Sequence, residues 1–187
     1  MEIRAATPAD IPGLEQLIAA SARQLSIGHY GEAETEAAIA HVFGVDSELV
    51  EDGTYLIVES DGRLAGCGGW SRRATLFGSD RFAARASGYV DPAVAPAKIR
   101  AFFVAPEFAR RGVGTVLLQA CEDAAIAAGF TSAELMATLP GVPFYEARGY
   151  VAGSAITQIY DGVGVRFVPM HKPIHQQEDT RAHTGNG

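Results

Sequence analysis

The chain has few cysteines, and they are not arranged to bind a metal. Its two cysteines, Cys67 and Cys121, lie in separate apolar segments without metal-ligand spacing. We therefore expect buried free thiols in a reducing compartment, and no disulfide. The sequence also has no zinc motif and no set of residues resembling a Ser-His-Asp triad, so a metal cofactor is not expected.

Long hydrophobic runs and an excess of positive charge are also missing. No apolar stretch approaches the roughly 20 residues that span a bilayer, and residues 1–5 lack the pattern of a signal peptide. The net charge is −7, whereas nucleic-acid binding depends largely on cationic side chains that neutralise phosphates. We therefore expect no membrane partner, no nucleic-acid partner and a cytoplasmic location. The acidic balance is compatible with a cationic amine substrate.

What the chain does contain is the composition of an ordinary globular domain. Of its 187 residues, 48% are apolar and 20% are charged, which is enough for one domain with its own core. The domain is expected to cover residues 1–174. Residues 175–187 are polar and follow the last apolar anchor, Ile174, so this tail is expected to be disordered or held by crystal packing.

Hydrophobic patterning divides the chain into alternating strands and helices. The expected strands are residues 2–6, 54–60, 63–71, 99–104, 132–138, 151–160 and 163–172. The expected helices are residues 10–25, 32–43, 110–128 and 140–147. Asp61-Gly62 and Asp161-Gly162 are typical of type I′ hairpin turns. Three glycines, Gly66, Gly68 and Gly69, indicate a bulge or a close backbone approach in their strand.

The most informative stretch is residues 99–129, which reads as a strand, a turn and a helix. Along the strand, Ile99, Ala101 and Phe103 alternate with Arg100, Phe102 and Val104. The turn that follows contains Gly112 and Gly114 at the start of the helix. Free backbone N–H groups at a helix N-terminus, with no Cβ to block approach, form an anion site.

Two motifs resemble those of the Gcn5-related N-acetyltransferase (GNAT) superfamily. Residues 103–115, FVAPEFARRGVGT, look like the family's strand four and pyrophosphate loop, and residues 143–150, PFYEARGY, look like its late helix. The resemblance covers residues 1–174. It implies an α/β (α+β) fold in the order β-α-α-β-β-β-α-β-α-β-β, with a mixed sheet flanked by helices and splayed between strands four and five. Two departures are Ala109, where the family commonly has Gln or Arg, and residues 138–141, which lack a frequent Asn.

The resemblance implies acetyl-CoA as cosubstrate. The N–H groups of residues 111–115 and the Thr115 hydroxyl would bind the diphosphate, and the Val104 N–H would polarise the thioester carbonyl. Arg110 and Arg111 either add positive charge or are solvated surface side chains. The implied cofactor-binding residues are Phe103, Val104, Arg110, Arg111, Gly112, Val113, Gly114, Thr115 and Tyr145.

The remaining chemistry requires an acid and a base. By resemblance, Tyr145 protonates the departing thiolate, and the alternative is a packing aromatic like Phe144. The strand-four Glu of some family members has no counterpart here. Glu134 is the first candidate for the general base, although it could instead end a strand in solvent. The other candidates are His29, Tyr30 and Asp91. Tyr30 and Trp70 are expected in the acceptor pocket, and Trp70 fits a core aromatic equally well.

Taken together, the sequence predicts acetyl transfer to a primary amine by direct attack in a ternary complex. The acceptor, a small-molecule or peptide amine, is not identified by the sequence. The alternative is an acyl-CoA-binding regulatory or sensor module without transferase activity. The family resemblance also implies a homodimer, formed through the terminal hairpin of residues 151–172.

Overall fold

The computed structural model describes residues 1–81 and 88–175. An eight-stranded mixed sheet runs through it in the order β1-β2-β3-β4-β5-β8-β6, with β7 also paired to β8. The strands are β1 (Glu2–Ala5), β2 (Tyr55–Ser60), β3 (Arg63–Ser71), β4 (Ala97–Val104), β5 (Ser132–Thr138), β6 (Val151–Ala152), β7 (Ile156–Tyr160) and β8 (Val163–Pro173). The helices are α1 (Ile11–Leu25), α2 (Glu32–His41), α3 (Ser47–Glu51), α4 (Val113–Ala127) and α5 (Val142–Glu146).

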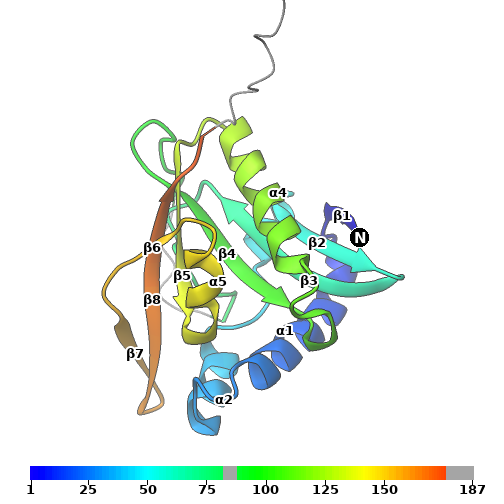
Figure 1. Cartoon of the computed structure of the whole chain (residues 1–187), viewed down its shortest axis with the longest axis vertical. Helices are drawn as coiled ribbons and strands as arrows, with labels where there is room; N and C mark the ends of the chain where they lie inside the picture. Colours follow the sequence, from blue (N-terminus) through cyan, green and yellow to red (C-terminus); the bar gives the residue numbers. More distant parts are fainter. Residues whose placement is uncertain (82–87, 176–187) are drawn as a thin grey trace, which may run out of the picture.

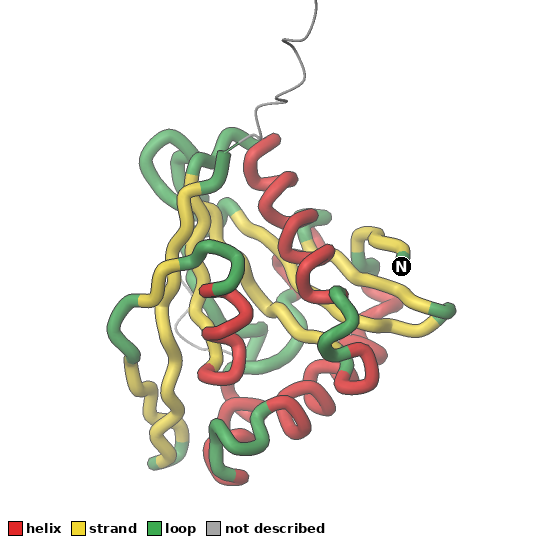
Figure 2. Tube along the Cα trace, viewed as in Figure 1, coloured by secondary structure: helices red, strands yellow, loops and turns green. Residues whose placement is uncertain are grey.

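The helices cover the sheet in two layers. Helix α4 crosses in front of β2 and β3, while α1 and α2 lie at the lower end of the molecule (Figures 1 and 2). None of the helices in the described residues is long and apolar enough to cross a membrane. Both cysteines are free and buried, as expected. The predicted α/β class with a mixed sheet flanked by helices is confirmed.

Local differences from the expected elements have simple causes. The short helix α3 was not predicted, because five residues cover little more than one turn and give no periodic signal. The single strand expected over residues 151–160 is divided into β6 and β7, both of which pair with β8. Ile174 is buried, and its N–H donates to the Thr131 carbonyl at 2.9 Å. The tail prediction concerns residues that, apart from His175, lie outside the described ones.

Both predicted hairpin turns have the expected backbone. Asp61 and Gly62 have φ of 53° and 72°, and Asp161 and Gly162 have φ of 49° and 82°. Positive φ at both central residues defines the type I′ turn, whose twist matches that of the flanking strands.

A β-bulge lies at the centre of the sheet, between β3 and β4. Cys67 pairs with Phe103 and Gly69 pairs with Arg100, so β4 carries one extra residue. Ala101 adopts a left-handed φ of 50°, and its carbonyl accepts a hydrogen bond from the buried Tyr55 hydroxyl at 3.1 Å. A bulge, one of the two predicted alternatives, is therefore present beside the glycines, but its extra residue lies on β4 and not on their own strand. The regular alternation expected along residues 99–104 is wrong beyond Arg100.

The bulge is followed by the splay between β4 and β5. These parallel strands pair only over three positions, from Ala97–Ala133 to Ile99–Leu135. Beyond them β5 remains paired with β8 as far as Thr138, while β4 remains paired with β3 as far as Val104. Each strand thus follows its other neighbour, and the gap between them widens (Figure 1).

Replacing Gly68 with alanine should destabilise the protein by about 1–3 kcal/mol, the usual range for overpacking a core. A Cβ at this position would lie 2.4 Å from Cδ2 of the Phe102 ring, which packs directly over the glycine. Chemical denaturation would measure the change in the free energy of unfolding. The double variant with Phe102→Leu should recover part of the loss, and strictly additive effects would contradict this packing.

Candidate active site

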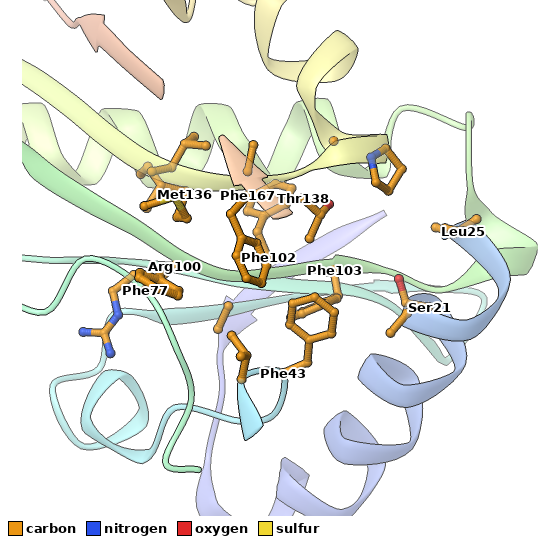
Figure 3. A pocket seen from close by; sticks show the side chains of 18 of the residues that line it. Ser21, Leu25, Phe43, Phe77, Arg100, Phe102, Phe103, Met136, Thr138 and Phe167 are labelled. Atoms are coloured by element: carbon orange, nitrogen blue, oxygen red, sulfur yellow. The ribbon is translucent and has the colours of Figure 1, made fainter. Parts of the chain in front are cut away.

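A cavity of about 230 Å³ occupies the splay. On one side it reaches Gly114 at the start of α4, and Phe144 and Tyr145 on α5. On the other side it reaches Ser21 and Leu25 of α1. Figure 3 shows β4 passing between these two sides, with Phe102 and Phe103 projecting from it. The cavity thus connects the two helical layers through the opened sheet.

The first turn of α4 is arranged as an anion site. Its N-cap is Gly112, with φ of 84°, and no side chain caps the helix. The first N–H groups, on Val113, Gly114 and Thr115, have no partner within the helix. Arg110 has a left-handed φ of 60° just before this turn. These donors and the helix dipole favour a negative charge at this end of α4.

The predicted cofactor residues divide into two groups. Phe103, Val104, Gly114 and Tyr145 line the cavity together. The others are at the start of α4 or just before it, outside the lining: Arg110, Arg111, Gly112 and Thr115 are exposed and Val113 is buried. The Val113 side chain belongs to the core, so only its backbone is available to a ligand.

Arg148 joins this end of α4 to α5, and sequence reasoning missed it. Its guanidinium carbon lies 3.8 Å from the centroid of the Phe144 ring. It donates to the Phe144 carbonyl at 2.8 Å and to the Thr115 hydroxyl. Its position inside the motif of residues 143–150 could have indicated a role for Arg148, but only the fold places it beside Thr115.

Gly114 also has a role in helix packing. A Cβ there would lie 3.0 Å from the Phe144 ring. The glycine therefore allows α4 and α5 to approach closely.

Tyr145 is buried among aromatic rings at one wall of the cavity. Its ring centroid lies 5.0 Å from that of Phe144, 5.6 Å from Tyr150 and 6.1 Å from Phe102. Burial raises the pKa of the Tyr145 phenol above its ordinary value. The hydroxyl is therefore a proton donor throughout the neutral range.

The Val104 N–H faces the gap. The next N–H along the chain, that of Ala105, donates to the Ala65 carbonyl at 2.9 Å, on the β3 side. Successive N–H groups of a strand point to opposite edges, so the Val104 N–H points toward β5. It is thus a fixed donor beside the cavity that Val104 lines.

The predicted base and acceptor residues lie outside this cavity. The Glu134 carboxylate pairs with the Lys98 ammonium. The Tyr30 hydroxyl donates to the Arg166 carbonyl at 2.5 Å and accepts from the Leu139 N–H at 2.9 Å, and burial raises the pKa of Tyr30 to about 12. Tyr30 therefore ties the segment before α2 to β8.

Trp70, His29 and Asp91 are not brought to the cavity either. The Trp70 ring packs edge-on against Phe130 at 6.1 Å and lines a separate cleft with Tyr89. His29 and Asp91 are exposed, and the Asp91 carboxylate accepts from the Ala93 N–H at 2.9 Å. The structure thus assembles the predicted cofactor side of the site but not the predicted acceptor side.

Comparison with known families decides the classification. The Acetyltransferase (GNAT) family matches residues 19–150, which is more than half of the chain. The chain belongs to this GNAT family. None of the curated proteins compared with the chain matches it.

Solved structures share the fold at low sequence identity. A GCN5-related N-acetyltransferase from Rhodopseudomonas palustris has a TM-score of 0.69 and 23% identity, with 92% of this chain and 95% of that chain covered. The PaiA N-acetyltransferase from Thermoplasma acidophilum, solved with coenzyme A, has a TM-score of 0.62 and 18% identity, covering 92% and 98%. YncA of Salmonella typhimurium, a putative acetyltransferase solved with acetyl-CoA, has a TM-score of 0.60 and 14% identity, covering 94% of each chain.

Proposed function

We propose that this GNAT protein transfers the acetyl group of acetyl-CoA to a primary amine, by direct attack in a ternary complex. The observation that carries the proposal is the cavity through the splay. One side meets the uncapped start of α4 and Tyr145, and the other opens between α1 and the segment after α2. A donor and an acceptor can therefore meet between β4 and β5 from opposite layers.

The residues present fit coenzyme A. The open turn at Gly112, where a Cβ would meet nothing within 4 Å, leaves room for phosphates beside the free N–H groups. Arg148 adds a cation next to Thr115. The two neighbours solved with coenzyme A or acetyl-CoA support the same reading of the fold.

The chain's own groups supply the polar contacts of the reaction. Acetyl-CoA brings the reactive thioester when bound. The Val104 N–H is proposed to donate to the carbonyl oxygen, where negative charge develops as the amine attacks. Tyr145 is proposed to supply a proton to the thiolate as the C–S bond breaks and the C–N bond forms.

Water is the proposed route for the proton that the amine loses. Among the described residues that line the cavity there is no Asp, Glu or His. Glu134, the base named from the sequence, is paired with Lys98 outside the lining. We therefore replace Glu134 in this proposal by solvent that enters the cavity.

Two measurements test the proposed function. Calorimetry should detect acetyl-CoA binding, and thiol release from acetyl-CoA should depend on added amine in a panel of primary amines. Binding without thiol release in the presence of any amine would favour the alternative, a sensor module. Loss of both would contradict the assignment of the cavity.

Replacing Arg148 with methionine should weaken acetyl-CoA binding by about five- to tenfold. Methionine keeps an apolar stem over the Phe144 ring but removes the cation proposed to attract the phosphates, and a partly exposed charge pair contributes about 1 kcal/mol. Calorimetry would measure the dissociation constant. The matched control is Arg23→Met on α1, where an exposed arginine pairs with Glu36. Equal effects of the two changes would exclude a specific role for Arg148.

Two further expectations stay proposals. A homodimer through the terminal hairpin is supported by apolar side chains at this edge, where Val151 is 70% and Ile159 is 65% exposed. Light scattering would test it. The cytoplasm is the proposed location, supported by the two buried free thiols.

A further inference from the structure

The acceptor side of the cavity is walled by phenylalanines from separate parts of the chain. The Phe43 ring lies 5.4 Å from that of Phe103 and 6.3 Å from that of Phe167, and Phe77 lies 5.7 Å from Phe167. Phe43 follows α2, Phe77 is in the loop after β3, and the others are on β4 and β8. Figure 3 shows all four rings around the opening of the sheet, with Leu25 at the end of α1 nearby.

Charge is nearly missing from the same walls. Among the described lining residues the one charged side chain is Arg100, because the Tyr145 phenol keeps its proton at neutral pH. Its guanidinium is fully buried in an ion pair with the equally buried Asp46, and it points away from Phe43 and Phe103 in Figure 3. Nearby, the Glu15 carboxylate is paired with Arg81. The protein's net negative charge therefore does not extend into this cavity.

This lining penalises a second positive charge. A buried ammonium without a carboxylate partner loses several kcal/mol of hydration. Aromatic faces return about 2 kcal/mol or somewhat more through a desolvated cation–π contact, which offsets only part of this loss. The reacting amine avoids the penalty because it must be neutral to attack, but a second ammonium on the acceptor does not.

We infer that the acceptor is a monoamine with an apolar body, either aliphatic or aromatic, and that polycationic amines are poor substrates. This inference rests on the proposed acetyl transfer. The apolar body would lie against Phe43, Phe103 and Phe167, with its amine directed toward the splay.

A matched pair of amines tests the inference. Hexylamine and 1,6-diaminohexane share one carbon chain, and the diamine adds a second ammonium at neutral pH. We expect kcat/KM per reactive amine to be at least about tenfold higher for hexylamine, measured by thiol release. Equal values, or a preference for the diamine, would overturn the inference and leave the proposed function intact. Absence of thiol release with every amine would instead contradict the proposed function itself.

A gain-of-specificity variant gives a second readout. Leu25 lines the cavity and is 37% exposed, so a carboxylate there remains partly hydrated. Leu25→Glu should raise kcat/KM for 1,6-diaminohexane at least threefold and lower it for hexylamine. The neutral control Leu25→Gln should not favour the diamine. An equal rise in kcat/KM for 1,6-diaminohexane with Leu25→Gln would contradict this explanation. It would show that the second ammonium is excluded for a reason other than the lack of a carboxylate.

Discussion

Replacing Thr115 with aspartate is expected to weaken acetyl-CoA binding by about 100-fold, or about 2.7 kcal/mol. Thr115 is exposed in the first turn of α4, beside the free N–H groups proposed to hold the diphosphate. A carboxylate there would repel the phosphates at close range. It would also neutralise Arg148, which now donates to the Thr115 hydroxyl. Calorimetry would measure the dissociation constant.

The same change should leave the fold as stable as before. An acidic side chain in the first turn of a helix is favourable by about 0.3–1 kcal/mol, and Arg148 is placed to pair with it. Loss of binding would therefore not reflect unfolding. The control is Thr131→Asp, the same substitution at an exposed position beyond the other end of α4. If Thr115→Asp bound acetyl-CoA as tightly as the control, the phosphate site would lie elsewhere.

This variant separates ligand binding from packing better than a change at the glycines. A side chain at Gly114 would press against the Phe144 ring at about 3.0 Å. At Gly112 it would have to adopt φ of 84°. Either change would disturb the turn itself, whatever binds there.

Replacing Tyr145 with phenylalanine is expected to lower kcat by about 10²–10⁴-fold, the usual range for loss of a positioned proton donor. The ring would keep its contacts with Phe102, Phe144 and Tyr150. The dissociation constant for acetyl-CoA should therefore change little. Stopped-flow thiol release and calorimetry would measure the two quantities separately.

Tyr160→Phe is the matched control, because the Tyr160 hydroxyl is buried on β7 without a hydrogen-bond partner among the described residues. Its kcat should equal that of the unchanged protein. An equal kcat for Tyr145→Phe would exclude the acid role and leave Tyr145 as a packing aromatic.

The pH dependence of kcat should reflect the raised pKa of Tyr145. Burial raises the pKa of Tyr145, so the proton is retained up to at least the ordinary phenol value of about 10. Activity should then show no loss from this group between about pH 7 and pH 10, and any decline would begin above that range. A decline with a midpoint near pH 8 in the unchanged protein, absent in Tyr145→Phe, would contradict the raised pKa of Tyr145, because the group would then titrate below the ordinary phenol value.

The sequence by itself determined most of the order of elements, apart from α3 and the division of residues 151–160, and it named the residues of the proposed cofactor side. The order of strands and helices could be predicted because apolar periodicity, glycines and Asp-Gly turns are local signals. Both type I′ hairpins are examples. The segment from β4 into α4 could be predicted for the same reason, since the strand, the turn at Gly112 and the helix are consecutive in the chain. The bulge was indicated by Gly68, but its extra residue lies on β4, across the strand pair.

Only the tertiary structure decided which side chains surround the proposed acceptor side of the cavity. Tyr30 and Glu134 carry groups suited to binding or catalysis, but their partners, Arg166 and Lys98, are 136 and 36 residues away along the chain. Phe43, Phe103 and Phe167 meet in the same way, from the segment after α2 and from two strands. Long-range packing sets which polar groups are already paired and which side chains face a cavity. Neither property is a local feature of the sequence, so the lining of the proposed acceptor side could be identified only in the folded protein.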